Sequence, residues 1–321
     1  DAGRTSVHED AYKTNYFNGR YYGEYRHLFA DKHDVKVVAG LDLEINKYRD
    51  LGGTKLDLIT NDVATVNTAT NDKPSLYGGY THWATMGYFA RLNYAYDERY
   101  LFEVSLRRNG SSRFIGDKRW ATFPAFSLGW NIANEAFFAP LKQHVSMLKL
   151  RGSWGTLGNT EVKALYPWFL AQPVGTANSQ WVLNGERQNT SNSPGLVSSS
   201  LTWERIESWN VGLDFGAFNN RLQGQLDYFN RTTRDMVGPP APKPFTIGAG
   251  LPQVNNATLV SKGWEAELRW RDNIGKVNYG ARLVLSDDIQ TVTEYNNPTG
   301  SLSTWYSGKR VGEIWGYTTV G

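Results

Sequence analysis

The chain contains no cysteine, which excludes a disulfide framework and thiol chemistry. It also has no uninterrupted apolar run near the roughly 18 residues that a membrane-spanning helix requires. The net charge is only +3, and the basic residues are spread along the chain rather than clustered. Nucleic acid is therefore not an expected partner.

Catalytic and metal-binding motifs are missing as well. The five histidines, at positions 8, 27, 33, 82 and 144, form no HExxH or similar close pair that would direct two ligands to one metal. No serine lies in a GxSxG elbow. We therefore expect no enzyme activity, no catalytic residues, no metal site and no cofactor.

Aromatic residues, in contrast, are abundant, with 12 Trp, 18 Tyr and 14 Phe. A large β-sandwich or a sugar-binding surface would explain this enrichment. A membrane β-barrel would explain it equally well, because amphipathic rings form girdles at both water–lipid boundaries. The mean hydropathy of −0.50 does not decide between them, since a barrel averages apolar outer residues with polar inner ones.

Strict alternation of apolar and polar residues indicates long antiparallel hairpins. Residues 209–230 and 264–285 are the clearest examples, each with a short turn in its middle. In the second hairpin four bulky apolar residues alternate with four charged ones: Trp264, Ala266, Leu268 and Trp270 against Glu265, Glu267, Arg269 and Arg271. Similar patterns predict about ten strands, the first near residues 21–29, and an eleventh beginning near Val311.

Strand length and loop asymmetry favour a transmembrane barrel. Expected strands such as residues 35–45 are as long as the roughly 9–11 residues of a tilted membrane-spanning strand, whereas strands of soluble proteins average about 5–6. Short turns are expected at residues 30–34, 97–99, 217–220 and 272–276. Long connections are expected near residues 49–85, 109–122, 157–202, 234–258 and 289–310. Short periplasmic turns and long extracellular loops are typical of outer-membrane barrels, so we interpret residues 1–321 as one all-β, antiparallel barrel unit.

The alternation also predicts which face of the wall each side chain occupies. We expect the barrel lumen to be lined by Asp214, Gln225, Glu265, Glu267, Arg269, Arg271 and Arg282. We expect lipid contact from the alternate apolar positions, which include Leu213, Phe215, Leu222, Leu226, Leu268, Tyr279 and Leu283.

Two stretches carry a resemblance to a known family. The segment LTWERIESWNVGLDFGAFNNRLQGQLDYFNRTTRDMV contains Trp203-Glu204, then Asn210, Gly212, Asp214 and Phe215, then Asp227-Tyr228-Phe229 and Thr233. This order resembles the signature strand pair of SusC/RagA-type TonB-dependent outer-membrane transporters. The segment VNNATLVSKGWEAEL is similar to the next strand of that family, with Ser261 where the family has Asn. LKLRGSWGTLGN and VGEIWGYTTVG are also similar to the family.

The resemblance implies the rest of the functional prediction. The chain is expected to be the middle of a barrel of about 22 strands, a fragment without the plug domain and signal sequence of such transporters, and unable to close a barrel alone. The family implies import of glycans or peptides across the outer membrane of a Gram-negative, Bacteroidota-like bacterium. Its expected partners are TonB, acting through the plug, a SusD-like surface lipoprotein and membrane lipid.

Loop aromatics are the candidates for contact with a solute or the lipoprotein: Tyr166, Trp168, Trp181, Trp305 and Tyr306. Each could stack on a sugar ring or pack against the lipoprotein cap, but packing within the loops or in an interfacial girdle is the commoner role for any one of them. A passive outer-membrane porin and a small complete ten-stranded barrel remain as alternatives.

Overall fold

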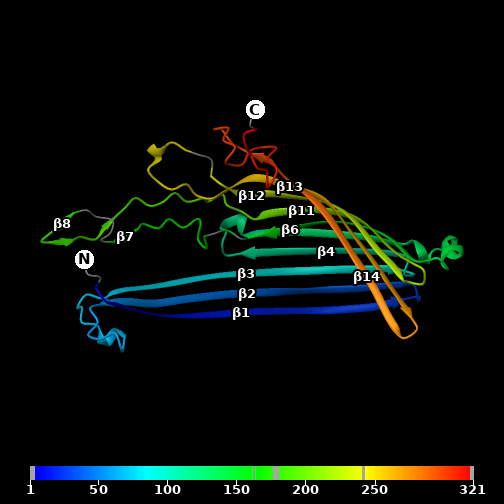
Figure 1. The fold of residues 1–321 in the computed structure, drawn as a ribbon, viewed down its shortest axis with the longest axis horizontal. Coiled ribbons are helices and arrows are strands. Elements are labelled where there is room, and N and C mark those ends of the chain that lie inside the picture. The colour runs from blue at the N-terminus through cyan, green and yellow to red at the C-terminus, as the bar shows by residue number, and fades with distance from the viewer. Residues whose placement is uncertain (1–3, 161, 163, 176–180, 241–242, 319–321) are drawn as a thin grey trace.

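The computed structural model describes residues 4–160, 162, 164–175, 181–240 and 243–318. Its centre is one antiparallel sheet of ten strands, in which each strand pairs with its neighbours along the chain (Figure 1). The strands are β1 (Ser6–Phe29), β2 (His33–Leu56), β3 (Ser75–Tyr96), β4 (Tyr100–Ser111), β5 (Trp120–Asn131), β6 (Val145–Asn159), β11 (Glu204–Ala217), β12 (Leu222–Gly238), β13 (Val254–Ile274) and β14 (Val277–Tyr295). The prediction of about ten antiparallel strands is confirmed.

The remaining elements are small. Two-residue strands lie in the connection between β6 and β11, namely β7 (Val174–Gly175), β8 (Val182–Leu183), β9 (Glu186–Arg187) and β10 (Thr190–Ser191). The 3-10 turns are η1 (Val66–Thr68), η2 (Gly116–Arg119), η3 (Ile132–Asn134), η4 (Ala136–Leu141) and η6 (Phe245–Ile247). In the part of the chain that the structure describes, no helix is long and apolar enough to cross a membrane.

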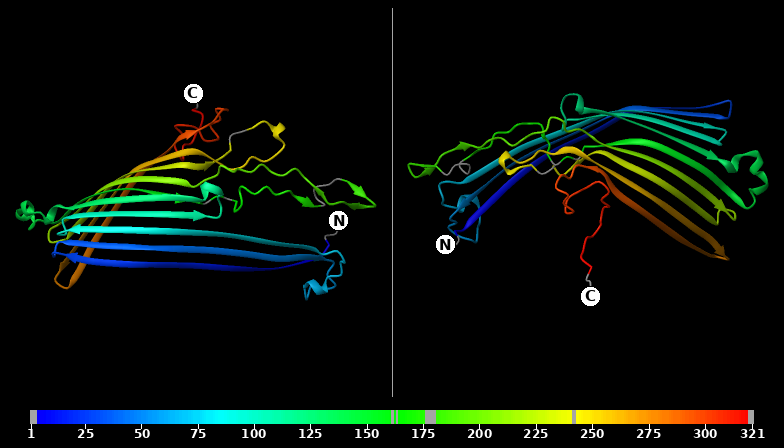
Figure 2. Two further views of the ribbon diagram at one scale, coloured as in Figure 1. Left: turned by 180° about the vertical axis from the view of Figure 1, so that it is seen from behind. Right: turned by 90° about the horizontal axis from the view of Figure 1, so that it is seen from above.

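The sheet is twisted and curved, and its two outer strands stay apart (Figure 2). Strands β1 and β14 stand at opposite ends of the strand order, so the ten described strands do not close on each other. The small complete barrel that the sequence left open is therefore not the arrangement found here.

The tight turns all lie at one edge of the sheet, the short-turn edge, as the sequence predicted (Figure 1). Backbone hydrogen bonds link successive turns along it, including Asp97 N–H to Lys32 O at 2.7 Å and Asn131 N–H to Arg99 O at 2.7 Å. Both Asp97 and Glu98 have positive φ angles, at 49° and 54°. Turns of that kind match the right-handed twist of the paired strands.

The long connections lie at the opposite edge, the long-loop edge, but the strands reach further into them than expected. Strand β2 continues to Leu56 and β3 begins at Ser75, so their connection spans 57–74 rather than 49–85. Strand β1 likewise begins at Ser6 rather than near residue 21. Alternation did not reveal these extensions because both of their faces carry polar residues, for example Lys47 on one and Asp50 on the other.

The prediction of an eleventh strand near Val311 is wrong. Described residues 311–318 contain no strand, and only an isolated bridge joins Thr291 to Arg310. The segment folds back on β14, where Val311 N–H donates to Gln290 O at 2.9 Å. Gly308 and Gly312, with φ angles of 96° and 85°, turn the chain on either side of this contact and end its extended course.

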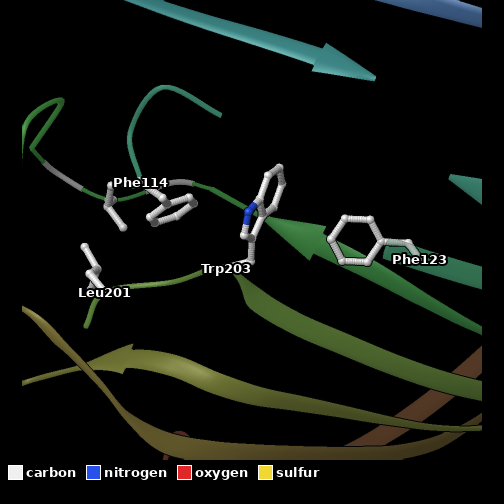
Figure 3. Close-up of a cluster of buried hydrophobic side chains, with 5 residues drawn as sticks. Phe114, Phe123, Leu201 and Trp203 are labelled. Atoms are coloured by element: carbon white, nitrogen blue, oxygen red, sulfur yellow. The ribbon is translucent and has the colours of Figure 1, made fainter. Parts of the chain in front are cut away.

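The two clusters of buried hydrophobic side chains lie at the long-loop edge rather than within the sheet. One cluster joins Phe114, Phe123, Val162, Leu201 and Trp203 (Figure 3). The Trp203 ring lies 5.7 Å from that of Phe114 and 5.5 Å from that of Phe123. A second cluster joins Ala257, Val292 and Tyr295. The connections are thus anchored to the strand ends by apolar packing.

Candidate functional site

The strand register divides the sheet into two faces of opposite character. Directly paired residues share a face, and the pairs Leu213↔Leu226 and Leu226↔Ala266 define what we call the apolar face. The pairs Asp214↔Gln225 and Gln225↔Glu267 define the polar face.

The predicted facing groups follow this division. All seven residues expected to line a lumen lie on the polar face, and all seven expected to contact lipid lie on the apolar face. The register separates the two groups completely. It leaves the assignment of one face to the lumen and of the other to lipid as a prediction.

Arg151 of β6 is the centre of one cluster on the polar face. Its guanidinium donates to Asp214 of β11 at 3.0 Å and to Asp227 of β12 at 2.6 Å, so one side chain connects three strands. Gly212 lies directly opposite Arg151. A Cβ there would stand 2.6 Å from Arg151 Cζ and 2.6 Å from Asp227 Oδ1, so only glycine leaves room for this cluster.

A second cluster repeats the design between β2 and β4. Arg107 donates to Asp42 and also to Asn109 Oδ1 at 2.7 Å. The contact between Arg107 and Asp42 passes over Gly87 of β3, where a Cβ would stand 2.6 Å from Asn109 Oδ1 and 2.6 Å from Asp42 Oδ1. Removing a side chain from the strand in between thus lets charged groups meet across it.

The other predicted lumen residues are partly paired. Arg282 forms two hydrogen bonds of 2.8 Å with the Glu267 carboxylate, and Arg269 approaches the same carboxylate at 3.2 Å. Among the described residues, no ion pair involves Glu265 or Arg271. The polar face therefore combines fixed ion pairs with charges that remain available.

Aromatic rings are frequent on the apolar face, near both edges of the sheet and between them. Near the short-turn edge they include Tyr96, Tyr100, Trp130 and Trp270, nearer the long-loop edge they include Trp154, Trp209, Tyr228 and Trp264, and Tyr94, Phe102 and Phe126 lie between these groups. On β1 the rings of Phe17, Tyr21 and Tyr25 follow one another along the same face. Aromatic residues on the lipid-facing surface are characteristic of outer-membrane barrels.

The loop aromatics fall into separate places rather than one site. Tyr166 is fixed to the exposed edge of β3, where its hydroxyl accepts from His82 N–H at 2.9 Å and donates to His82 O at 2.8 Å. Trp168 is half-buried and packs edge-on against Phe169, with ring centroids 6.2 Å apart. Trp181 is 82% exposed.

Trp305 and Tyr306 lie far along the chain, beside β14. Trp305 packs edge-on against Tyr295, 5.9 Å between ring centroids, within the second buried cluster. The Tyr306 hydroxyl donates to Glu313, and Lys309 Nζ lies 5.4 Å from the Tyr306 ring centroid. Both residues hold the segment after β14 in place. Of the five candidates, Trp181 has the largest exposed fraction.

No metal-binding constellation occurs within residues 4–160, 162, 164–175, 181–240 and 243–318, where no three His, Asp or Glu side chains gather suitably.

Comparison with known proteins shows which protein family this sheet belongs to. The family model described as TonB dependent receptor-like, beta-barrel matches residues 2–319. The chain belongs to this family. It is 32% identical to the TonB-dependent receptor SusC of Bacteroides thetaiotaomicron over 66% of this chain and 20% of that protein. It is 29% identical to the TonB-dependent receptor P39 of Formosa agariphila over 99% of this chain and 30% of that protein.

A solved structure of the RagAB peptide transporter shows the same fold. Its TM-score with this chain is 0.79 at 24% identity, covering 90% of this chain and 31% of that one. The predicted resemblance to SusC/RagA-type TonB-dependent receptors is confirmed by these matches. The chain spans between about a fifth and a third of the length of these relatives.

Within the TonB-dependent receptor barrel, the motif residues have structural roles that sequence reasoning did not assign. Glu204 accepts from Val237 N–H at 2.8 Å and from Asn159 Nδ2 at 2.7 Å, so the Trp203-Glu204 pair fastens three strand ends together. Arg151 was not singled out from the sequence. The signal that could have found it is a charged residue facing the motif glycine Gly212 in the preceding strand.

Proposed function

We propose that this chain forms part of the wall of an energised importer in the outer membrane of a Gram-negative, Bacteroidota-like bacterium. The observation that carries the proposal is the separation of an apolar and a polar face in the sheet of a TonB-dependent receptor barrel. The apolar face, with its many aromatic rings, suits contact with lipid. The polar face suits a water-filled lumen in which a plug domain elsewhere in the full-length protein would respond to TonB.

The proposed solute is a glycan fragment or a peptide. The polar face offers carboxylates, guanidinium groups and amides rather than an apolar lining. Such groups recognise hydroxyl and peptide groups through hydrogen bonds. The name of the RagAB relative supports a peptide, while SusC carries no solute in its name.

The proposed partner is a SusD-like lipoprotein that covers the long-loop edge. The connections there are long and are held to the strand ends by the two buried clusters. Trp181, in the connection between β6 and β11, would meet either the lipoprotein or the solute. The support for this partner comes from the SusC and RagAB relatives.

Uptake by cells that carry the full-length protein tests the importer against a porin. Labelled oligosaccharides and labelled peptides of matched size are supplied with and without a protonophore, which removes the energy that TonB transmits. We expect uptake of one solute class to cease when the protonophore is present. Uptake that continues at the same rate would refute the importer and favour the passive porin.

Deletion of a gene for a SusD-like lipoprotein from the same cells addresses the partner separately. We expect uptake at low solute concentration to fall while the barrel remains in the outer membrane. Unchanged uptake at every concentration would remove the SusD-like partner from the proposal without affecting the importer.

A further inference from the structure

Three exposed cations on β1 and β2 continue the apolar face beyond its apolar band. The register of β1 with β2 and of β2 with β3 runs without a bulge. Lys13, Lys47 and Arg49 therefore project from the same face as Leu43 and Ile45. Lys47 and Arg49 follow Ile45 at alternate positions, on the side towards the long-loop edge. We call these three residues the basic cluster.

The basic cluster has no counter-charge in the described structure. Lys13 lies directly opposite Arg49, and like charges in that position destabilise a strand pair. The neighbouring positions on the same face contain no carboxylate: they are Ala11, Asn15, Leu51, Gly78, Tyr80 and His82. No described Asp or Glu forms an ion pair with any of the three cations.

One pair of opposite charges elsewhere on the apolar face is satisfied within the sheet. At the long-loop side of β11 and β12, Glu207 pairs with Arg234 at 3.6 Å and also accepts from Trp154 Nε1 at 3.0 Å. Both strands that flank Lys47 and Arg49 are described, so no acid of a neighbouring strand stands beside these two cations on this face, whereas Lys13 lies on the edge strand β1 and has a described neighbouring strand on one side only. The basic cluster is thus arranged to receive an anion from outside the sheet.

We infer that the basic cluster binds the phosphate of a lipid headgroup at the membrane surface, an inference that rests on the proposed membrane placement. Headgroups lie immediately beyond the hydrocarbon layer, which is where the basic cluster lies relative to Ile45. Directly opposed side chains have Cβ atoms about 4.5–5.5 Å apart, so Lys13 and Arg49 can hold one phosphate between them. The planar guanidinium of Arg49 binds phosphate oxygens in pairs.

The adjacent ring supports a lipid rather than a soluble anion. Tyr80 of β3 is paired directly with Arg49 and is 58% exposed. Tyrosine is enriched at the boundary between hydrocarbon and water, where its ring packs on acyl chains and its hydroxyl reaches the headgroups. A free phosphate would gain nothing from this ring or from the apolar band below it.

Native mass spectrometry of the purified full-length protein in detergent tests the inference. Phosphatidic acid, phosphatidylcholine and inorganic phosphate are titrated against the wild type and against Arg49→Gln and Lys47→Gln. Lys55→Gln is the matched control, because Lys55 is on the same face of β2 but six residues beyond Arg49, about 20 Å further from the apolar band.

We expect Arg49→Gln and Lys47→Gln each to weaken phosphatidic acid binding about fivefold, the effect of about 1 kcal/mol per cation at a membrane surface. Lys55→Gln should leave it unchanged, and phosphatidylcholine should bind all forms alike. Equal effects of Arg49→Gln and Lys55→Gln would overturn the inference. Inorganic phosphate that competes at the concentration of the lipid would also overturn it, in favour of a soluble anion.

The same variants separate this inference from the proposed importer. Energised uptake should persist in Arg49→Gln, because the basic cluster faces away from the polar lumen. Loss of headgroup selectivity with intact uptake would support the inference. Headgroup selectivity equal to that of the wild type would reject it, whatever the uptake assay shows.

Discussion

Replacing Gly212 by alanine should destabilise the barrel by breaking the Arg151 cluster. The new Cβ would stand 2.6 Å from Arg151 Cζ, so the guanidinium must leave the position from which it reaches Asp214 at 3.0 Å and Asp227 at 2.6 Å. Hydrogen bonds to charged groups contribute about 1.5–3 kcal/mol each. Hydration of the displaced Arg151 side chain, which is 27% exposed, recovers part of this free energy. Hydration of Asp227 recovers little, because that side chain is only 8% exposed. We expect a loss of about 2–3 kcal/mol.

Gly152→Ala in the full-length protein is the matched control. Gly152 is the neighbour of Arg151 on β6, but on the apolar face, and its Cβ would meet nothing closer than Asn210 O at 3.9 Å. Alanine there should be neutral or stabilising by about 0.5–1 kcal/mol, since it restricts the unfolded chain. The free energy of unfolding is measured by urea titration in detergent micelles, with heat-modifiable migration on gels reporting the folded fraction.

A double-mutant cycle tests the assigned cause. In an Arg151→Ala background the space over residue 212 is free, so adding Gly212→Ala should change the free energy of unfolding by less than about 0.5 kcal/mol. An unchanged destabilisation in that background would refute the account of the glycine. So would equal effects of Gly212→Ala and Gly152→Ala in the wild type.

Three further predictions concern the faces and the loops. Leu268→Arg should destabilise the barrel by roughly 2–4 kcal/mol if it lies near mid-bilayer, whereas Arg269→Ala should leave it assembled; equal loss of heat-resistant migration would mean that the facing is wrong. Tyr166→Phe should release the β6–β11 connection from β3 and increase protease cleavage within it several-fold, and unchanged cleavage would contradict the anchor. The hydrogen bond from Tyr306 holds the pKa of Glu313 below its ordinary value of 4.5, so this contact stabilises the folded segment above that pH and is lost as pH falls through the lower folded pKa. The protection of that segment's amides against hydrogen exchange, measured relative to the intrinsic exchange rate at each pH, should therefore fall in acid, and Glu313→Gln should abolish this loss of protection.

The hairpins were predictable because their two faces differ. In residues 264–285 apolar residues occupy every second position. Only one pairing register places all of them on the same face of the sheet. The same logic located the short turns, since alternation stops at them. Pairing between successive hairpins then followed from chain order, as it does in most antiparallel sheets.

The parts that alternation missed share one physical property. The outer halves of β1, β2 and β3 have polar residues on both faces, such as Lys13 and Tyr12 at adjacent positions of β1. No hydrophobic driving force distinguishes their faces, so their strand character comes from backbone pairing with neighbours. The segment near Val311 shows the opposite error, because its local sequence favours extension while Gly308 and Gly312 turn the backbone.

The polar clusters could not have been derived from any single strand. From the sequence, Asn210, Gly212 and Asp214 indicate a strand and a family resemblance, but they do not indicate what the glycine is for. Gly212 is required by Arg151, which belongs to the preceding strand of the sheet. The arginine and its partner Asp214 are separated by 63 residues, including the whole long connection from β6 to β11. Only the register of the folded sheet, which places Arg151 opposite Gly212, brings the two side chains within hydrogen-bonding distance. When a barrel strand contains a motif of glycine and acidic residues, the neighbouring strand should therefore be searched for a cation that occupies the space above the glycine.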